Sequence, residues 1–316
     1  GTPINDAGSY VLEVTASDLA GNTATRTFNF AIQGMALPEF KYAICATGNV
    51  TIENNALVRS KDCQSGALGD HGYVGADGNV SMSNNSTVRG GVVAGGNLGM
   101  GIKSHLWGNA TLGGTKSGGG TIHGTISYPT PDPSPCSCTY DLAGLLDEKE
   151  VHNDNEALAT DPAIAPYLVN GGLELPNNAH ATLPAGEYYF DHLRLNNNAV
   201  LGATGGDVYL YVRHSFVMSN NSRLDSPCAS GPAPSGVEGP MFRIYAGTNT
   251  SAGEQFTFVN NTETRALVYA PLAGVEFKNN ATFCGAAFVK TATLKQNAKV
   301  YLDETVWAGV AEVWCE

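Results

Sequence analysis

The hydrophobic and polar residues of this chain follow one recurring pattern: apolar, any residue, Asn, Asn, any two residues, apolar. Two copies share the identical letters Met-Ser-Asn-Asn-Ser, at residues 82–86 and 218–222. An apolar residue usually lies two positions ahead as well, and this alternation predicts a short strand with one buried face. The Asn pair predicts a corner after the strand, because Asn tolerates the left-handed backbone region and hydrogen-bonds to its own backbone. The corner residues predicted in this way are Asn55, Asn85, Asn198, Asn221, Asn261, Asn280 and Asn297.

The spacing of the corners indicates the repeat architecture. From Asn178 to Asn297 the second Asn recurs after 20, 23, 40, 19 and 17 residues, and the step of 40 corresponds to two coils. Steps near 20 predict the coils of a three-faced parallel β-helix with strands of about 5 residues. Ankyrin and tetratricopeptide arrays need longer units that are rich in helix-forming residues, which this chain lacks. We therefore predict an all-β parallel β-helix (a β-solenoid), in which stacked Asn side chains form an amide ladder and serve as scaffold rather than as ligands.

The chain divides into a hairpin and a solenoid. Residues 1–34 alternate twice around a Gly-Asn turn and predict a two-stranded β-hairpin. Residues 38–316 are assigned to the β-helix, which we expect to be one continuous stack built from residues 40–128 and 171–312.

Residues 129–170 interrupt the repeat. They begin with a Pro-rich linker and continue with one predicted short helix, for which Asp141 is the expected N-cap and Leu142, Leu145 and Leu146 face inward. We expect this excursion to cover the side or an end of the solenoid. The polar run at 152–156 resembles a cation loop only superficially, because the remaining ligands of an EF-hand are missing. No metal and no other cofactor is predicted.

Composition limits the partners of the chain. It has 316 residues, a formal net charge of −12 and only 15% charged residues. An acidic balance argues against nucleic acid and anionic membrane surfaces as partners. No run of some 18 apolar residues is present, so no membrane span is predicted in this chain. The chain opens without a signal peptide and inside a recognisable module, so we expect a mature or truncated product.

Seven cysteines are scattered along the chain without a CxxC pair, which argues against zinc. A β-helical protein with disulfides belongs outside the cytoplasm, because thiols are kept reduced inside it. We expect at least two disulfides. Cys45 and Cys63 form the predicted pair, because 18 residues is about one coil and would bring the two side chains close together.

Two parts of the chain resemble known families. The segment TASDLAGNTATRTFNFAI resembles the last two strands of the Ig-like repeats of bacterial surface proteins. The segments LPAGEYYFDHLRLNNNAVL, GGDVYLYV and ALVYAPLAGVEFKNNATFCGAAFVKTATLKQNAKVYLDETV together resemble a family of β-helical domains on surface proteins of Gram-negative bacteria. That family follows pilin-like or lipoprotein leaders and is distantly similar to the polymer-forming bactofilins. The resemblance implies an extracellular or cell-surface location and a structural role, and it brings no catalytic residues.

Three functions remain open on the sequence. A polysaccharide-degrading β-helix enzyme is the least favoured, because the acidic residues are dispersed and catalysis of this kind needs paired carboxylates. A cell-surface adhesin that binds glycan or a host surface would be favoured by exposed aromatic residues on a solenoid face. A non-catalytic structural subunit that self-associates into a surface filament would be favoured by uncapped solenoid ends and by a hairpin that another molecule completes. The apolar C-terminal segment leads us to prefer the filament, with Tyr10, Phe28, Phe30, Trp307 and Trp314 as expected assembly contacts.

Overall fold

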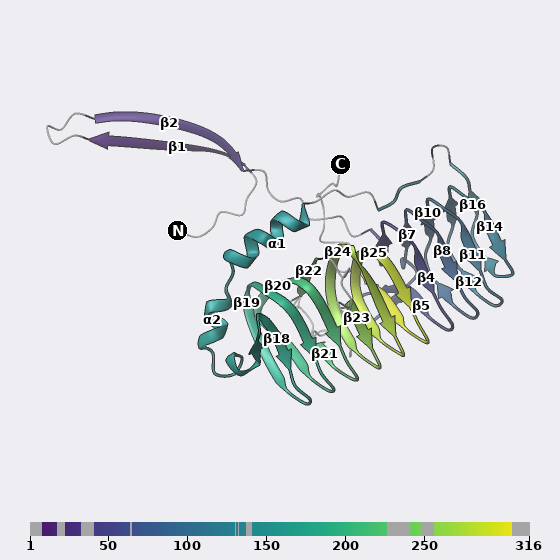
Figure 1. Ribbon diagram of the computed structural model, residues 1–316. Helices are drawn as coiled ribbons and strands as arrows, with labels where there is room; N and C mark the ends of the chain where they lie inside the picture. The colour runs from purple at the N-terminus through teal and green to yellow at the C-terminus, as the bar shows by residue number, and fades with distance from the viewer. Residues whose placement is uncertain are drawn as a thin grey trace. The chain divides into compact units, whose positions relative to one another are not determined.

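A computed structural model of the chain describes residues 8–17, 23–32, 41–63, 65–129, 131, 133–136, 141–225, 241–247 and 256–304. The chain divides into two compact units, one that contains strands β1 and β2 and one that spans residues 40–311. The second unit is a large, mostly parallel sheet wound into a solenoid (Figure 1). The predicted fold class, an all-β parallel solenoid, is therefore confirmed.

The first unit is a β-hairpin. Strands β1 (Gly8–Ser17) and β2 (Thr23–Ile32) pair antiparallel over their whole length, with Tyr10 opposite Phe30 and Leu12 opposite Phe28. They form a two-stranded sheet of their own.

The N-terminal half of the solenoid, residues 41–128, consists of short strands that stack in three columns. Buried and half-exposed positions alternate in most of its three-residue strands, which places Val50, Ile52, Val80 and Met82 in the core. The first column is β3 (Ile44–Ala46), β7 (Val74–Ala76), β10 (Val92–Ala94), β13 (Ala110–Leu112) and β16 (Ile126–Ser127). The second is β4 (Val50–Ile52), β8 (Val80–Met82), β11 (Leu98–Met100) and β14 (Lys116–Gly118). The third is β5 (Leu57–Lys61), β9 (Thr87–Val88), β12 (His105–Leu106) and β15 (Thr121–Ile122), while β6 (Leu68–Gly69) pairs antiparallel with β5.

The C-terminal half, residues 168–303, has longer strands and a more aromatic core. Phe258 stacks on Phe277 with ring centroids 5.0 Å apart, and Phe216 stacks on Phe256 at 5.1 Å. Parallel pairing runs from each coil to the next. The strands are β17 (Leu168–Val169), β18 (Gly172–Leu175), β19 (His180–Leu195), β20 (Val200–Met218), β21 (Arg223–Asp225), β22 (Phe242–Ala246), β23 (Phe256–Val259), β24 (Glu263–Lys278), β25 (Thr282–Leu294) and β26 (Lys299–Asp303).

The two halves join out of sequence order. The last strands of the C-terminal half stack on the first strands of the N-terminal half, since β25 pairs with β3 and β4, and β26 pairs with β5. We call this junction the seam. In Figure 1 the colours along the solenoid run from teal through green to yellow and change abruptly to blue at the seam. The chain thus enters in the middle of the solenoid, runs to one end, crosses to the other end and returns to the middle.

The predicted Asn residues lie on one line of corners that crosses the seam. All seven have positive φ, between 57° and 65°. In the C-terminal half their amides hydrogen-bond from coil to coil: Asn221 Nδ2 donates to Asn198 Oδ1 at 3.0 Å, and Asn280 Nδ2 donates to Asn261 Oδ1 at 3.1 Å. Across the seam the line continues through the backbone, where Asn297 N donates to Asn54 O at 3.2 Å. Asn at these corners therefore adopts the left-handed backbone conformation along the whole line. In the C-terminal half its side chain also takes part in an amide ladder.

The excursion caps one end of the solenoid. It contains α1 (Leu142–Val151), α2 (Asn155–Thr160) and the 3-10 turn η1 (Ala165–Tyr167). As predicted, Asp141 caps α1, and its carboxylate accepts a hydrogen bond from the backbone N–H of Gly144 at 2.9 Å. The three leucines expected to face inward, Leu142, Leu145 and Leu146, are buried.

Polar residues between the two helices replace a missing neighbouring strand. Asp154 N donates to Glu187 O at 2.8 Å, and its carboxylate accepts from Glu187 N at 2.8 Å. The amide of Asn155 bonds both the N–H and the carbonyl of Tyr189, at 3.2 and 2.5 Å. These contacts satisfy the edge of β19 at Glu187 and Tyr189, which would otherwise template pairing with another molecule. The run that resembled a cation loop is an edge cap.

The other end is the coil of β14, β15 and β16, which within the described residues pairs on one side only. Lys116 Nζ donates to the carbonyls of Gly118 and Gly120 at 2.8 and 3.2 Å, so part of this edge is satisfied by its own lysine. The expectation that the C-terminal coil forms an open solenoid end is wrong, because β26 lies between β25 and β5. Sequence order does not decide which coil is terminal, because every coil offers the same parallel edges.

The disulfide prediction is also corrected. Cys45 is bonded to Cys136, 91 residues away, and not to Cys63. The chain between Cys45 and Cys63 makes a full set of corners, but the linker after β16 returns along the N-terminal half and brings Cys136 to β3. Cys63 is disulfide-bonded as well, so the expectation of at least two disulfides is met.

Candidate functional site

A groove lies at one corner of the N-terminal half, between the column of β9 and β12 and the column of β10 and β13. Its floor contains Gly90 and Gly108, which belong to a set of glycines that recur with the coil at Gly72, Gly90, Gly108 and Gly124. A Cβ on Gly90 would come within 2.7 Å of Gly72 O, and one on Gly124 within 2.5 Å of Gly108 O. Only glycine lets successive coils stack this closely at the corner. The absence of side chains hollows the surface there.

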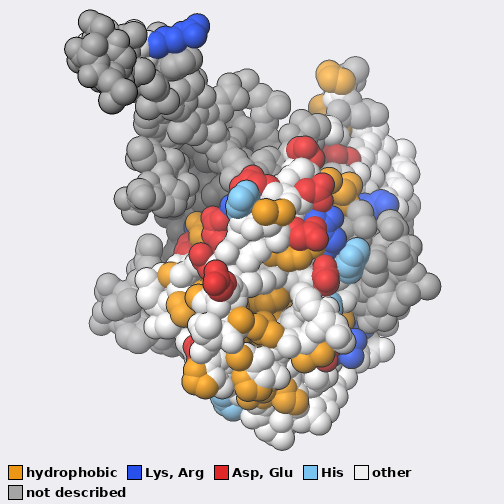
Figure 2. All heavy atoms as spheres, turned by 60° about the vertical axis from the view of Figure 1, so that its left-hand side comes forward, with side chains coloured by type: hydrophobic (Ala, Val, Ile, Leu, Met, Phe, Trp, Pro, Cys, Tyr) orange, Lys and Arg blue, Asp and Glu red, His pale blue; other side chains and the backbone are white. Residues whose placement is uncertain are grey.

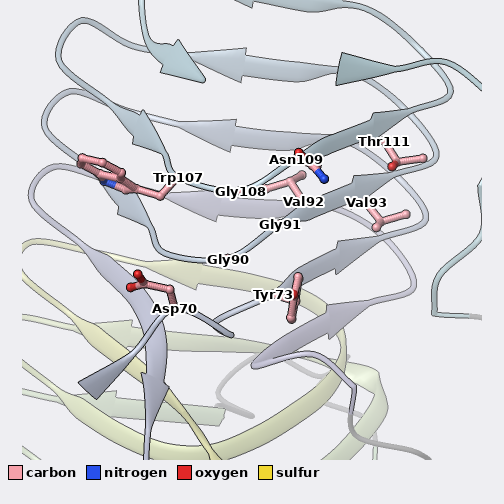
Figure 3. A pocket seen from close by; sticks show the side chains of 10 residues that line it. All are labelled: Asp70, Tyr73, Gly90, Gly91, Val92, Val93, Trp107, Gly108, Asn109 and Thr111. Carbon is pink, nitrogen blue, oxygen red and sulfur yellow. The ribbon is translucent and has the colours of Figure 1, made fainter. Parts of the chain in front are cut away.

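Aromatic side chains from both columns border the hollow (Figure 3). Trp107 follows β12 on one side, while Tyr73 precedes β7 and Thr111 lies in β13 on the other. Trp107 is 44% exposed and Tyr73 is 37% exposed. The groove encloses about 360 Å³ and is lined by Asp70, Tyr73, Gly90, Gly91, Val92, Val93, Trp107, Gly108, Asn109 and Thr111. This volume lies at the lower end of the range found for small-molecule sites.

The positions of the two aromatic rings are set by neighbouring coils. His123 stacks on Trp107 with ring centroids 3.9 Å apart, and the Arg89 guanidinium lies 4.7 Å from the centre of the Trp107 ring. These residues follow β15, β12 and β9, which are adjacent strands of one column. Trp107 is thereby held rigidly on the groove wall. The ring of Tyr73 lies over Gly91, where a Cβ would come within 3.0 Å of Tyr73 Cδ1.

The charge at the groove comes from one carboxylate. Asp70 lies 3.5 Å from the Arg89 guanidinium and 3.7 Å from that of Arg59. Asp70 is the only charged residue of the lining, so the lining itself carries no positive charge. The remaining lining side chains that carry hydrogen-bonding groups are Tyr73, Trp107, Asn109 and Thr111.

Among the described residues, the groove lining offers hydrogen-bonding side chains and one carboxylate. Glycoside hydrolysis needs two carboxyl groups on either side of the scissile bond, and the lining contains only Asp70. Over the part of the chain that the structure describes, no group of three or more His, Cys, Asp or Glu side chains is arranged to hold a metal ion. Within the same residues, no helix has the length and apolar character needed to cross a bilayer.

A second, shallower hollow of about 430 Å³ lies beside the Asn ladder, lined by His180, Asn198, Val200, Asn221, Arg223, Asn261 and Glu263. The amides of Asn198, Asn221 and Asn261 already bond one another in the ladder. Their hydrogen-bonding capacity therefore serves the scaffold.

An acidic face accompanies α1. Figure 2 shows acidic side chains gathered on the face brought forward from the left of Figure 1, with Lys and Arg side chains among them. Arg213 bonds Asp147 and Glu150 of α1 at 2.8 and 2.9 Å, and Lys149 bonds Glu187 at 2.6 Å. Partial burial alone would lower the pKa of Lys149, but the hydrogen bond and charge of Glu187 outweigh it and raise the pKa. These ion pairs fasten α1 to the solenoid.

The groove lining contains none of the residues expected from the sequence. The seven Asn corners belong to another edge of the solenoid, and Tyr10, Phe28 and Phe30 belong to the hairpin. Trp307 and Trp314 lie outside the described residues. The sequence pattern did not predict the groove, although glycines at intervals of 18, 18 and 16 residues from Gly72 mark this corner in the sequence.

Comparison with models of protein families, with curated proteins and with solved structures finds no match to this chain.

Proposed function

We propose that this protein is a non-catalytic binding module of the cell surface or extracellular space, which holds a saccharide in the glycine-floored groove. The observation that carries the proposal is the exposed Tyr73 ring on the wall of a hollow in which Asp70 is the only charged side chain and Trp107, held between Arg89 and His123, is the second aromatic residue. Sugars combine apolar C–H faces with a rim of hydroxyl groups. The Tyr73 ring suits the former, while Asn109, Thr111 and the Asp70 carboxylate suit the latter.

The partly capped solenoid ends support binding over end-to-end assembly. At one end Asp154 and Asn155 hydrogen-bond to Glu187 and Tyr189 of β19, and at the other Lys116 bonds two carbonyls of its own coil. The disulfide between Cys45 and Cys136 supports an oxidising compartment, where such bonds persist.

A glycan array followed by titration calorimetry tests the proposal. For a saccharide that binds the wild-type chain, Tyr73→Ala is expected to weaken affinity about ten-fold or more, which corresponds to roughly 1.4 kcal/mol. Asp70→Asn is expected to weaken it as well, through the loss of a charge-assisted hydrogen bond. The matched control is Tyr128→Ala, which removes another exposed tyrosine outside the groove lining. The proposal fails if the array gives no saccharide ligand, or if Tyr73→Ala and Tyr128→Ala bind equally well.

A second candidate is a structural subunit that self-associates through the hairpin. The observation that favours it is that β1 and β2 form a separate sheet of two ten-residue strands, which is marginal alone in water. Addition of a strand from another molecule would complete it. Deletion of residues 1–34 should then abolish self-association and leave the β-rich circular dichroism of the solenoid in place. Full-length protein that is monomeric at high concentration would remove this candidate.

A further inference from the structure

The seam is as extensive as a junction between consecutive coils of one half. At the seam, β26 pairs five residues with β5, and β25 pairs three with β3 and three with β4. The next junction, inside the N-terminal half, pairs three, three and two. Ile44, Ile52 and Val58 on one side and Val289, Leu294 and Val300 on the other are fully buried. The interface between the halves is thus a complete coil-on-coil contact.

The contact does not depend on chain continuity. The backbone leaves the C-terminal half after β26 and enters the N-terminal half at β3, so no peptide bond crosses the seam at the point of stacking. Each half therefore presents an edge that recognises the other half through backbone hydrogen bonds and buried side chains. Examples are Gly48 N to Lys290 O at 2.8 Å and Glu53 N to Leu294 O at 2.7 Å.

The backbone connection between the halves is short. Cys136 is fastened to the N-terminal half by its disulfide to Cys45 and by its N–H, which donates to Asp77 Oδ1 at 2.9 Å. Asp141 already belongs to the C-terminal half as the cap of α1. Only residues 137–140 lie between these two anchors. Short hinges between complementary parts favour exchange of those parts between copies.

We propose that the seam is also an interface between copies of this chain, in which the N-terminal half of one copy stacks on the C-terminal half of a second copy. The same strands and side chains meet at the seam whether it closes within one chain or between two. The two closures therefore differ only in the hinge and in the entropy of association. A tether of this kind gives the two halves an effective concentration of about a millimolar. The fraction of exchanged dimer therefore rises with protein concentration. Exchange takes place while the solenoid is forming, when halves of different copies can meet.

Single cysteines placed on opposite sides of the seam test this directly. Thr51 and Thr293 are partners across the seam, and both are half-exposed. Full-length Thr51→Cys and Thr293→Cys variants are unfolded and reduced together, then refolded in a glutathione redox buffer. Neither chain alone can form a disulfide between positions 51 and 293, so this bond, located by peptide mass spectrometry, reports a seam between copies. The matched control mixes Thr51→Cys with Ser81→Cys, since Thr51 and Ser81 are partners inside the N-terminal half.

The expected result is a covalent dimer in the first mixture at several times the level of the control, increasing with protein concentration. A Thr51→Cys/Thr293→Cys double variant in one chain should close internally and checks that the pair can bond. Light scattering on the refolded wild-type chain measures the dimer fraction without introduced cysteines. We expect this fraction to increase with the protein concentration during refolding. If the mixed variants give no more of the cross-linked peptide than the control, or the wild-type chain refolds only to monomer at every concentration, the proposal is overturned.

Discussion

The ladder of Asn side chains makes a quantitative prediction, because two corners of the same line differ in one respect. Asn221 and Asn85 are both exposed and have nearly equal φ, 57° and 58°. The amide of Asn221 donates to Asn198 Oδ1 at 3.0 Å and accepts from Asn261 Nδ2 at 3.1 Å. Asn85 lies in the N-terminal half, where its next-coil contact is the backbone bond from its N–H to Ile102 O.

Substitution by alanine separates the two contributions. Asn85→Ala places an ordinary residue in the left-handed region and is expected to lower the free energy of unfolding by about 1–2 kcal/mol. Asn221→Ala carries the same backbone penalty and also removes two amide hydrogen bonds, each of which contributes about 0.5–1 kcal/mol at an exposed site. The total for Asn221→Ala is therefore about 2–4 kcal/mol. Glycine at the two positions tolerates the backbone conformation, so the difference between Asn221→Gly and Asn85→Gly should again be about 1–2 kcal/mol.

Urea unfolding of the four variants, followed by circular dichroism, measures these differences through the midpoint and the slope. An unchanged slope shows that the mutations act on stability rather than on the unfolded state. If Asn221→Ala and Asn85→Ala lower the free energy of unfolding equally, the amide bonds contribute nothing and the corner needs Asn for its backbone alone.

Two further predictions concern covalent and ionic links. Replacing Cys45 and Cys136 together by alanine should lower the free energy of unfolding by up to about 4–5 kcal/mol, because the disulfide closes a loop with a sequence separation of 91. Denaturation without reductant measures the loss of stability, and an unchanged unfolding midpoint would contradict the prediction. Partial burial would raise the pKa of Glu276, but hydrogen bonds from Lys278 and Lys295 outweigh it and lower the pKa. A folded-state pKa below the unfolded value of about 4.3 means that the stabilisation is present above that pH and is lost as pH falls through the folded pKa. Glu276→Gln should therefore show a shallower loss of stability in acid than the wild-type chain, and parallel pH profiles would contradict this.

The sequence by itself determined the repeating unit of this protein. The apolar alternation and the Asn pairs are local signals, because strand burial and positive φ depend on a few neighbouring residues. The residues from Asn198 to Asn297 therefore predicted both the solenoid and its corners. The cap and the buried leucines of α1 followed from the same kind of local rule.

Only the tertiary structure decided the order in which the coils stack. Every coil presents parallel backbone edges and an apolar interior, so the repeat alone does not specify that β3 stacks on β25. The choice depends on contacts between residues more than 200 positions apart, such as Ile52 with Leu294. The same cause misled the disulfide prediction, since Cys136 reaches Cys45 only through the return path of the linker. It also decided the groove, because Trp107 and Tyr73 line one hollow only after the coils have stacked at the glycine corner.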